Sequence, residues 1–138
     1  MLSVLALCDH CMSTTGLRIL VVEDDPNHRK LARQVLEDCG HVVTDADDGE
    51  EALAHLDTRD FDLVVLDMRL PGMDGREFIR RVRHSGREYA DIPIIVMTGY
   101  GLGQHMDLFR RYDIHDYMDK PYDSDLLLDR IHHYQPRA

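Results

Sequence analysis

The sequence has no long hydrophobic run and no basic opening segment. None of its apolar stretches approaches the roughly 20 residues that a helix needs to span a bilayer. The first residues carry no basic group ahead of their very short apolar segment, as an export signal would. We therefore expect a cytoplasmic protein that neither spans a membrane nor is anchored to one.

The sequence also lacks an excess of positive charge, since its formal net charge is −10 at pH 7. Nucleic-acid binding draws its affinity from clustered Lys and Arg side chains, so this acidic balance argues against a large footprint on a phosphate backbone. We expect no direct nucleic-acid partner.

Cysteines are few: the three are Cys8, Cys11 and Cys39. This odd number in a chain of cytosolic character argues against a disulfide framework. Cys8, His10 and Cys11 could form half of a zinc site, but no second closely spaced ligand pair accompanies them, which favours a disordered leader. Because Met12 offers a second start, we treat residues 1–16 as a disordered or artefactual extension.

The length of 138 residues and the 43% hydrophobic content suffice for one domain with a proper core, and not for a second domain of ordinary size. From Leu17 onward, short apolar runs alternate with segments of helical period, which is typical of βα units stacked into a parallel sheet. We expect one domain over residues 17–135 and no output domain.

The pattern predicts a doubly wound α/β fold. Strands are expected at residues 18–22, 41–46, 62–66, 92–97 and 114–118. Helices are expected at residues 26–40, 50–56, 74–83, 104–112 and 123–134. The third strand is nearly all apolar, so it should lie in the centre of the sheet with both faces covered. Asp25 is expected to cap the first helix, ahead of Pro26 at its first position.

Polar residues follow four of the predicted strands. They are Glu23, Asp24 and Asp25 after the first strand, Asp67 after the third, Thr98 and Gly99 after the fourth, and Lys120 and Pro121 after the fifth. Ligands of an open parallel sheet bind beyond the carboxyl ends of its strands. The sequence therefore brings carboxylate, hydroxyl and ammonium groups to one edge of the sheet.

The segments VVEDDP, LDMRLPGMDG, MTGYG and DYMDKP, in this order and spacing, resemble the receiver domain of two-component response regulators. Each motif alone is weak, but together they are specific, and the match spans residues 17–134. The resemblance implies a flavodoxin-like, CheY-like sheet of five parallel strands in the order 2-1-3-4-5, with five helices on its two faces. It also implies that Asp67 accepts a phosphoryl group from a histidine kinase or histidine phosphotransfer protein, with no activity on other substrates.

Crowded carboxylates repel one another and would force a proton onto one of them unless a cation intervenes. A hard divalent cation, Mg²⁺ or Mn²⁺, prefers such oxygen ligands. We assign Asp24 and Asp67 as direct ligands and Glu23 as a ligand through water, with the backbone carbonyl of Arg69 added by resemblance. Asp67 then stays ionised and attacks phosphorus, while Lys120 offsets charge on the transferring oxygens.

A phosphoryl group adds about −1.5 to −2 charges, so its neighbours must respond. We expect the Thr98 hydroxyl and the Gly99 N–H to bind two of its oxygens. By resemblance, this movement is coupled to Tyr117, whose alternative is a tyrosine with one face on the sheet and a solvated hydroxyl. The resemblance also implies a cis peptide bond before Pro121. It further implies a changed face, formed by residues 104–112, the fifth strand and the last helix, for a downstream protein or a phosphorylation-dependent dimer.

The sequence departs from the family pattern near the phosphorylation site. Arg69 lies two residues beyond Asp67, and Tyr100 lies two residues beyond Thr98. Both are long enough to lean over the site and to exclude the water that hydrolyses an acyl phosphate, so we expect a long-lived phosphorylated state. Asp113 stands where a glycine is common in the family, and Asp tolerates the left-handed conformation better than most residues.

Two other classes of protein remain as alternatives. A pseudo-receiver would keep the fold as an interaction module without phosphotransfer, and the intact set Glu23, Asp24, Asp67, Thr98 and Lys120 argues against it. A phosphatase of the haloacid dehalogenase type also begins with an Asp at a strand end. Such an enzyme usually has a second Asp two residues later, where this chain has Arg69, and it needs substrate-covering insertions that this chain lacks.

Overall fold

The computed structural model describes residues 16–99, 102–114, 116–121, 123–134 and 136. The strands are β1 (Arg18–Val22), β2 (Val42–Ala46), β3 (Leu63–Asp67), β4 (Ile94–Thr98) and β5 (Asp116–Asp119). The helices are α2 (Pro26–Asp38), α3 (Gly49–Thr58), α4 (Gly75–Arg83), α5 (Met106–Arg111) and α6 (Ser124–Ile131), with a 3₁₀ helix η2 (Leu102–His105) ahead of α5.

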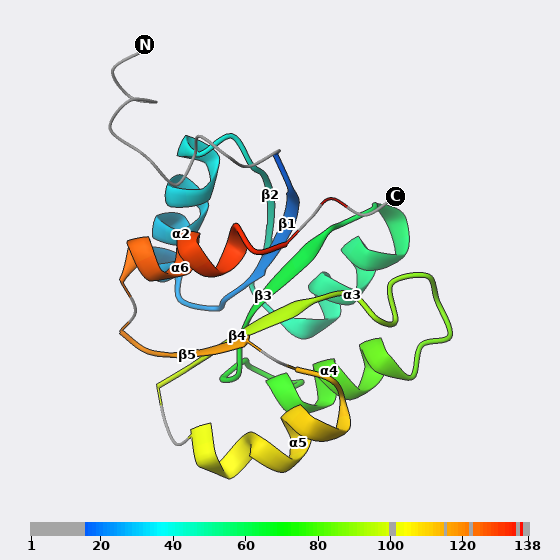
Figure 1. Ribbon diagram of the computed structural model, residues 1–138. Coiled ribbons are helices and arrows are strands. Elements are labelled where there is room, and N and C mark those ends of the chain that lie inside the picture. The colour runs from blue at the N-terminus through cyan, green and yellow to red at the C-terminus, as the bar shows by residue number, and fades with distance from the viewer. Residues whose placement is uncertain (1–15, 100–101, 115, 122, 135, 137–138) are drawn as a thin grey trace.

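The five strands form one parallel sheet in the order β2-β1-β3-β4-β5. In Figure 1, α2 and α6 lie on one face of this sheet, and α3, α4 and α5 lie on the other. The order reverses between β1 and β3, which is where open α/β sheets bind ligands. The expected doubly wound, flavodoxin-like fold is confirmed.

The apolar side chains of each strand alternate between two cores. One core packs under α3, α4 and α5 and includes Leu20, Leu66, Val96, Phe78 and Phe109. The other packs under α2 and α6 and includes Ile19, Val65, Met97, Leu36 and Leu127. All five residues of β3 are buried, so its predicted central position is confirmed.

Aspartates cap α2 and α4, the helices that follow β1 and β3. The Asp25 carboxylate accepts hydrogen bonds from the N–H groups of Asn27 and His28, which confirms its predicted capping role at the start of α2. The Asp74 carboxylate accepts from the Glu77 N–H at the start of α4. These caps begin both helices a few residues beyond the strand ends, so the intervening loops line the same edge of the sheet.

Two predicted strands begin too early. β4 begins at Ile94 because Pro93 has no N–H group to donate to a ladder. β5 begins at Asp116, because the Ile114 N–H donates to the Phe109 carbonyl and so belongs to the end of α5. Between them, Asp113 adopts a left-handed conformation with φ of 56°, which confirms that aspartate supports this turn.

Cys39 follows α2 and is disulfide-bonded, so the expectation of no disulfide is wrong for this residue. A count of cysteines carries no information about which of them lie close together in space. Cys8, His10 and Cys11 lie outside the described residues, as does nearly all of the predicted extension over residues 1–16.

Within the described ranges, none of the helices combines the length and the apolar character needed to cross a membrane.

His41 precedes β2 and is buried as a neutral imidazole. Its Nδ1 accepts a hydrogen bond of 3.0 Å from the Leu17 N–H, and its ring lies 5.6 Å from that of His132. Burial, with a smaller contribution from His132, lowers the pKa of His41 from 6.5 to about 4. The unfolded chain therefore binds more protons than the folded chain between these two pH values.

We predict that His41 makes the folded state sensitive to mild acid. The contribution of His41 to stability is fully present above pH 6.5 and is lost as the pH falls toward 4, a change of about 2 kcal/mol between pH 7.5 and pH 5. Urea unfolding at both pH values should show that the free energy of unfolding falls by about 2 kcal/mol less in His41→Gln than in the native protein. The exposed His133→Gln serves as the control and should behave like the native protein. An equal pH dependence in all three proteins would contradict this prediction.

Candidate functional site

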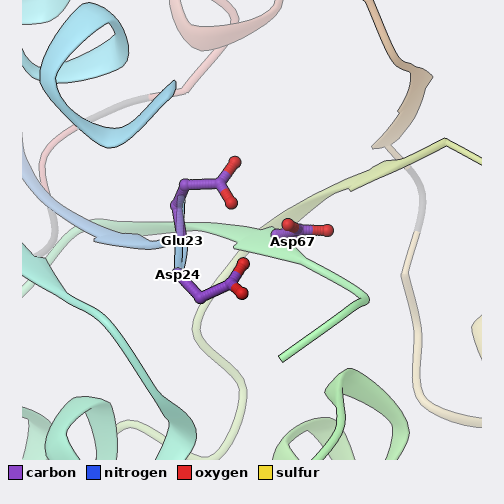
Figure 2. Close-up of side chains that lie close together, drawn as sticks. All are labelled: Glu23, Asp24 and Asp67. Atoms are coloured by element: carbon purple, nitrogen blue, oxygen red, sulfur yellow. The ribbon is translucent and has the colours of Figure 1, made fainter. Parts of the chain in front are cut away.

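Three carboxylates meet at the carboxyl ends of β1 and β3. The two strands pair with Val22 opposite Leu66, so the residues that follow, Glu23 and Asp67, are also neighbours. Oxygen atoms of Glu23, Asp24 and Asp67 all lie within 4.8 Å of one another. Figure 2 shows Glu23 and Asp24 projecting from the end of one strand toward Asp67 on the next. Within the described residues, no other group of His, Cys, Asp and Glu side chains is arranged in this way.

The three acids differ in their access to solvent. Glu23 is 1% exposed and Asp67 is 4% exposed, whereas Asp24 is exposed. A buried carboxylate is costly unless it is paired or hydrogen-bonded. The cluster therefore has a closed side at Glu23 and an open side at Asp24.

Lys120 follows the edge strand β5 and brings a positive charge to the acids. Its Nζ donates to Glu23 Oε1 at 2.6 Å and to Asp67 Oδ2 at 3.1 Å. The Lys120 N–H donates to the Thr98 carbonyl, which continues the ladder between β4 and β5. The peptide bond between Lys120 and Pro121 is cis. One ammonium group is thus shared by two buried carboxylates.

Lys120 does not balance the charge of the three carboxylates. Burial raises the pKa of Glu23 to about 7, its hydrogen bond with Asp67 adds to the rise, and Lys120 opposes it. Burial lowers the pKa of Lys120, but the bonds to Glu23 and Asp67 outweigh this effect, so the pKa is raised overall. Three carboxylates and one ammonium group carry a formal charge of about −2 when all are ionised. The site therefore favours a further cation or a proton.

Both oxygens of the Asp67 carboxylate are held. Oδ1 accepts a hydrogen bond of 3.0 Å from the Arg69 N–H, and Oδ2 accepts from Lys120. Asp67 ends β3 opposite Met97, so Thr98 lies one residue farther along the neighbouring strand. Thr98 is 2% exposed. The carboxylate is thus fixed in orientation next to a buried hydroxyl group.

A cleft of about 490 Å³ opens beside these residues. It is lined by Asp24, Met68, Arg69, Leu70, Pro71, Asp74, Arg76, Thr98 and His105. Gly99 follows Thr98 and has open space where a side chain would lie. The cleft therefore connects Asp24, on the open side of the acidic cluster, with Thr98 and with two arginines.

Two residues proposed from the sequence lie apart from this cluster or cannot be placed. Tyr117 lies in β5, opposite Val96, and its ring stacks on that of Phe109 at a centroid distance of 5.3 Å. Its partly buried ring therefore packs against α5. Tyr100, which was expected to lean over the site, lies outside the described residues.

The sequence pattern alone does not mark Arg76 and His105 as site residues. Arg76 lies in the first turn of α4, and His105 ends η2, yet Arg76 Nη1 and His105 Nδ1 are 3.2 Å apart. Nothing distinguished His105 among nine histidines. The available signal was that the helix after Asp67 begins with a cation one residue beyond Gly75.

The chain as a whole is matched by a known protein family. The sequence profile of the response regulator receiver domain covers residues 19–132. The chain belongs to this family. The expectation of a receiver domain is therefore confirmed.

The receiver domain has relatives that are longer than this chain. It is 38% identical to the CAI-1 autoinducer sensor kinase/phosphatase CqsS of Vibrio cholerae, over 83% of this chain and 17% of that protein. It is 37% identical to the transcriptional regulatory protein TcrA of Mycobacterium tuberculosis, over 88% of this chain and 47% of that protein. The chain thus spans less than half the length of either relative.

Solved receiver structures share the fold. The chemotaxis response regulator CheY4 of Vibrio cholerae matches with a TM-score of 0.79 and 28% identity, over 86% of this chain and 98% of that chain. A CheY-like receiver domain protein from Methanospirillum hungatei matches with a TM-score of 0.77 and 28% identity, over 85% of this chain and 91% of that chain. These matches cover nearly the whole of both structures.

The residues of the acidic cluster fit a hard divalent cation. All the side-chain donors are carboxylate oxygens, and they lie within 4.8 Å of one another. Mg²⁺ is bound in proteins through one or two carboxylates and keeps several waters, so one exposed acid at the mouth of the cluster suits it. Burial raises the pKa of Glu23 first, and Asp67 adds to the rise, so the two acids still disfavour each other's charge although both contact Lys120.

We predict that Mg²⁺ raises the melting temperature of the native protein and that Asp24→Asn removes this effect. The substitution takes away a charged ligand at the open side, so the affinity should fall at least about tenfold, as expected for a charged hydrogen bond or ligand pair. Asp25→Asn is the matched control, because it removes the same charge at the following residue and keeps a side chain that can cap α2. Equal Mg²⁺ responses of the two variants would contradict the assignment.

Proposed function

We propose that this receiver domain accepts a phosphoryl group on Asp67 from a histidine kinase or histidine phosphotransfer protein and signals through the change of shape that follows. The observation that carries the proposal is the setting of Asp67. Its carboxylate is buried at a strand end, held by Lys120 and by the Arg69 N–H, beside a cleft that reaches solvent. A held, ionised carboxylate is a competent nucleophile for an acyl phosphate.

We assign Asp24 and Asp67 as direct ligands of Mg²⁺ or Mn²⁺, Glu23 as a ligand through water, and the backbone carbonyl of Arg69 as a further ligand. When bound, the cation supplies positive charge beside the transferring oxygens and relieves the repulsion among the acids. Glu23 lies on the closed side of the cluster, where its bond to Lys120 also holds the ammonium group in place.

Several residues of the chain take part in the phosphoryl transfer, each with its own role. An Asp67 oxygen forms the new bond to phosphorus as the bond to the donor imidazole nitrogen breaks, and the imidazole keeps the electron pair. Lys120 already contacts Asp67, so its ammonium group is placed to follow the charge on the phosphoryl oxygens. The Thr98 hydroxyl and the Gly99 N–H bind two of these oxygens after transfer.

The signal leaves the site through the face formed by η2, α5, β5 and α6. Thr98 moves toward the phosphoryl group, and Tyr117 responds in the adjacent strand. The stack of Tyr117 on Phe109 supports this coupling, because it joins β5 directly to α5. The altered face binds a downstream protein or a second phosphorylated copy.

The relatives support the same kind of pathway. One is described as a sensor kinase and phosphatase and another as a transcriptional regulatory protein. We propose that this domain acts in the cytoplasm as a phosphorylated switch, with self-phosphorylation and slow self-dephosphorylation as its only chemistry. It contacts neither nucleic acid nor membrane directly.

We predict that intact-mass spectrometry after incubation with acetyl phosphate and Mg²⁺ will show one added phosphoryl group. The addition should be absent in Asp67→Asn and when Mg²⁺ is withheld, because the nucleophile or its charge compensation is then missing. Asp74→Asn, a cap on the cleft wall, should still be phosphorylated. A native protein that gains no phosphoryl group would favour the pseudo-receiver, a pure interaction module.

We predict a long-lived acyl phosphate, because the exposed Arg69 side chain lines the cleft and Tyr100 lies two residues beyond Thr98. The half-life should fall by a factor of about 3 to 10 in an Arg69→Ala, Tyr100→Ala double variant, which corresponds to about 1 kcal/mol in the barrier to hydrolysis. Decay of the phosphorylated mass after desalting measures it. A half-life that is shorter in the native protein than in the double variant would rule this out.

A further inference from the structure

Arg76 and His105 form a bridge on the wall of the cleft. Arg76 lies in the first turn of α4 and His105 ends η2, and both line the cleft together with Thr98. Arg76 Nη1 and His105 Nδ1 are 3.2 Å apart, a hydrogen-bond distance. This bridge joins the segment after β3 to the segment after β4.

Arg76 differs from Arg80 and Arg81 of the same helix in the partner it contacts. Arg80 and Arg81 both donate to the Glu77 carboxylate, at 2.6 to 2.9 Å. Within the described ranges, the only hydrogen-bond partner of the Arg76 guanidinium is the His105 ring. The bond requires a neutral imidazole with a lone pair on Nδ1, because a protonated ring offers only donors. Arg76 is therefore a cation held by a neutral acceptor.

The neutral partner is weaker than an anionic one. A guanidinium is attracted by the charge of an anionic acceptor, which a neutral imidazole lacks. Arginine also often binds phosphoryl oxygens through two parallel hydrogen bonds. A phosphoryl group on Asp67 would carry about −1.5 to −2 charges, and the carboxylate would lose its own, so the site becomes more negative overall. Lys120 is already shared by Glu23 and Asp67, so it cannot balance that charge alone. A guanidinium lining the same cleft gains energy by exchanging the imidazole for phosphoryl oxygens.

We propose that Arg76 is a second phosphoryl-binding cation of this domain, and that His105 holds it back until Asp67 is phosphorylated. On phosphorylation the guanidinium leaves the imidazole and binds the phosphoryl oxygens. This inference rests on the proposed function, since it needs a phosphoryl group on Asp67.

The exchange also releases His105. Its ring lies 6.0 Å from that of Phe109, and Phe109 stacks on Tyr117 at 5.3 Å. The end of η2 therefore loses its tie to α4 at the same moment that Thr98 is drawn inward. A row of rings leads from His105 to Tyr117 in β5, so the bridge contributes to the coupling between the cleft and the signalling face.

The first test measures the affinity for beryllium fluoride, a phosphoryl mimic, at saturating Mg²⁺ by ¹⁹F NMR. Arg76→Ala should weaken binding about tenfold, because a charged hydrogen bond is lost. His105→Phe keeps a ring against Phe109 but removes the acceptor, so it should tighten binding about threefold. Arg80→Ala, one turn along the same helix, is the matched control and should change the affinity less than about twofold.

The two variants should change the affinity for beryllium fluoride in opposite directions. This result distinguishes competition between His105 and the phosphoryl oxygens for Arg76 from a merely structural role of the bridge. If Arg76→Ala binds as tightly as the native protein, or if His105→Phe weakens binding as much as Arg76→Ala does, the inference is overturned. If the native protein itself binds no beryllium fluoride and gains no phosphoryl group, the proposed function fails and this inference fails with it. The two failures are therefore distinct.

The second test uses amide hydrogen exchange of the protein without Mg²⁺ or mimic. Arg76→Ala and His105→Phe should both speed exchange over residues 102–111, because each breaks the tie between η2 and α4. Arg80→Ala should leave exchange in this segment unchanged. The native protein loaded with Mg²⁺ and beryllium fluoride should show the same faster exchange, since the guanidinium has then left His105. Unchanged exchange in both bridge variants would show that the bridge restrains nothing.

Discussion

The rest of the site depends on one ammonium group shared by two buried carboxylates. Lys120 contacts Glu23 at 2.6 Å and Asp67 at 3.1 Å, and both acids are almost completely buried. Burying these charges costs several kcal/mol per ion unless close pairing repays it. The pairing is incomplete, because one ammonium group faces two carboxylates. The pKa of Glu23 is raised to about 7, first by burial and then by Asp67. The site is thus built with unbalanced negative charge, which a divalent cation can relieve.

The parallel sheet holds these charged groups next to one another. Parallel pairing of β1 with β3 sets Glu23 beside Asp67, and the ladder between β4 and β5 carries Lys120 to them. Apolar cores on both faces hold the strands in this register. The acids therefore cannot move apart to relieve their repulsion without breaking the sheet. Such a cluster is sensitive to any change of charge nearby, which is the property that a phosphorylation switch uses.

Much of this arrangement could be predicted from the sequence, because strand ends are easy to locate and parallel strands carry their ends to one edge. Asp67, Thr98 and Lys120 were found in this way. The Arg76 and His105 bridge was not, since it joins two loops whose approach depends on how α4 and η2 pack. The start of β5 was misplaced because Ile114 is apolar like a strand residue but bonds back to α5. The disulfide of Cys39 was missed because sequence spacing does not report spatial proximity.

A crystal structure of the protein with Mg²⁺ and beryllium fluoride would show whether the acidic cluster and the shared ammonium group serve the phosphorylation of Asp67. We expect the mimic bonded to Asp67, the cation between Asp24 and Asp67, and Lys120 turned from the Asp67 oxygen toward a fluorine atom. Neither ion bound in a crystal whose cleft is open to solvent, with Lys120 still spanning Glu23 and Asp67, would contradict this expectation.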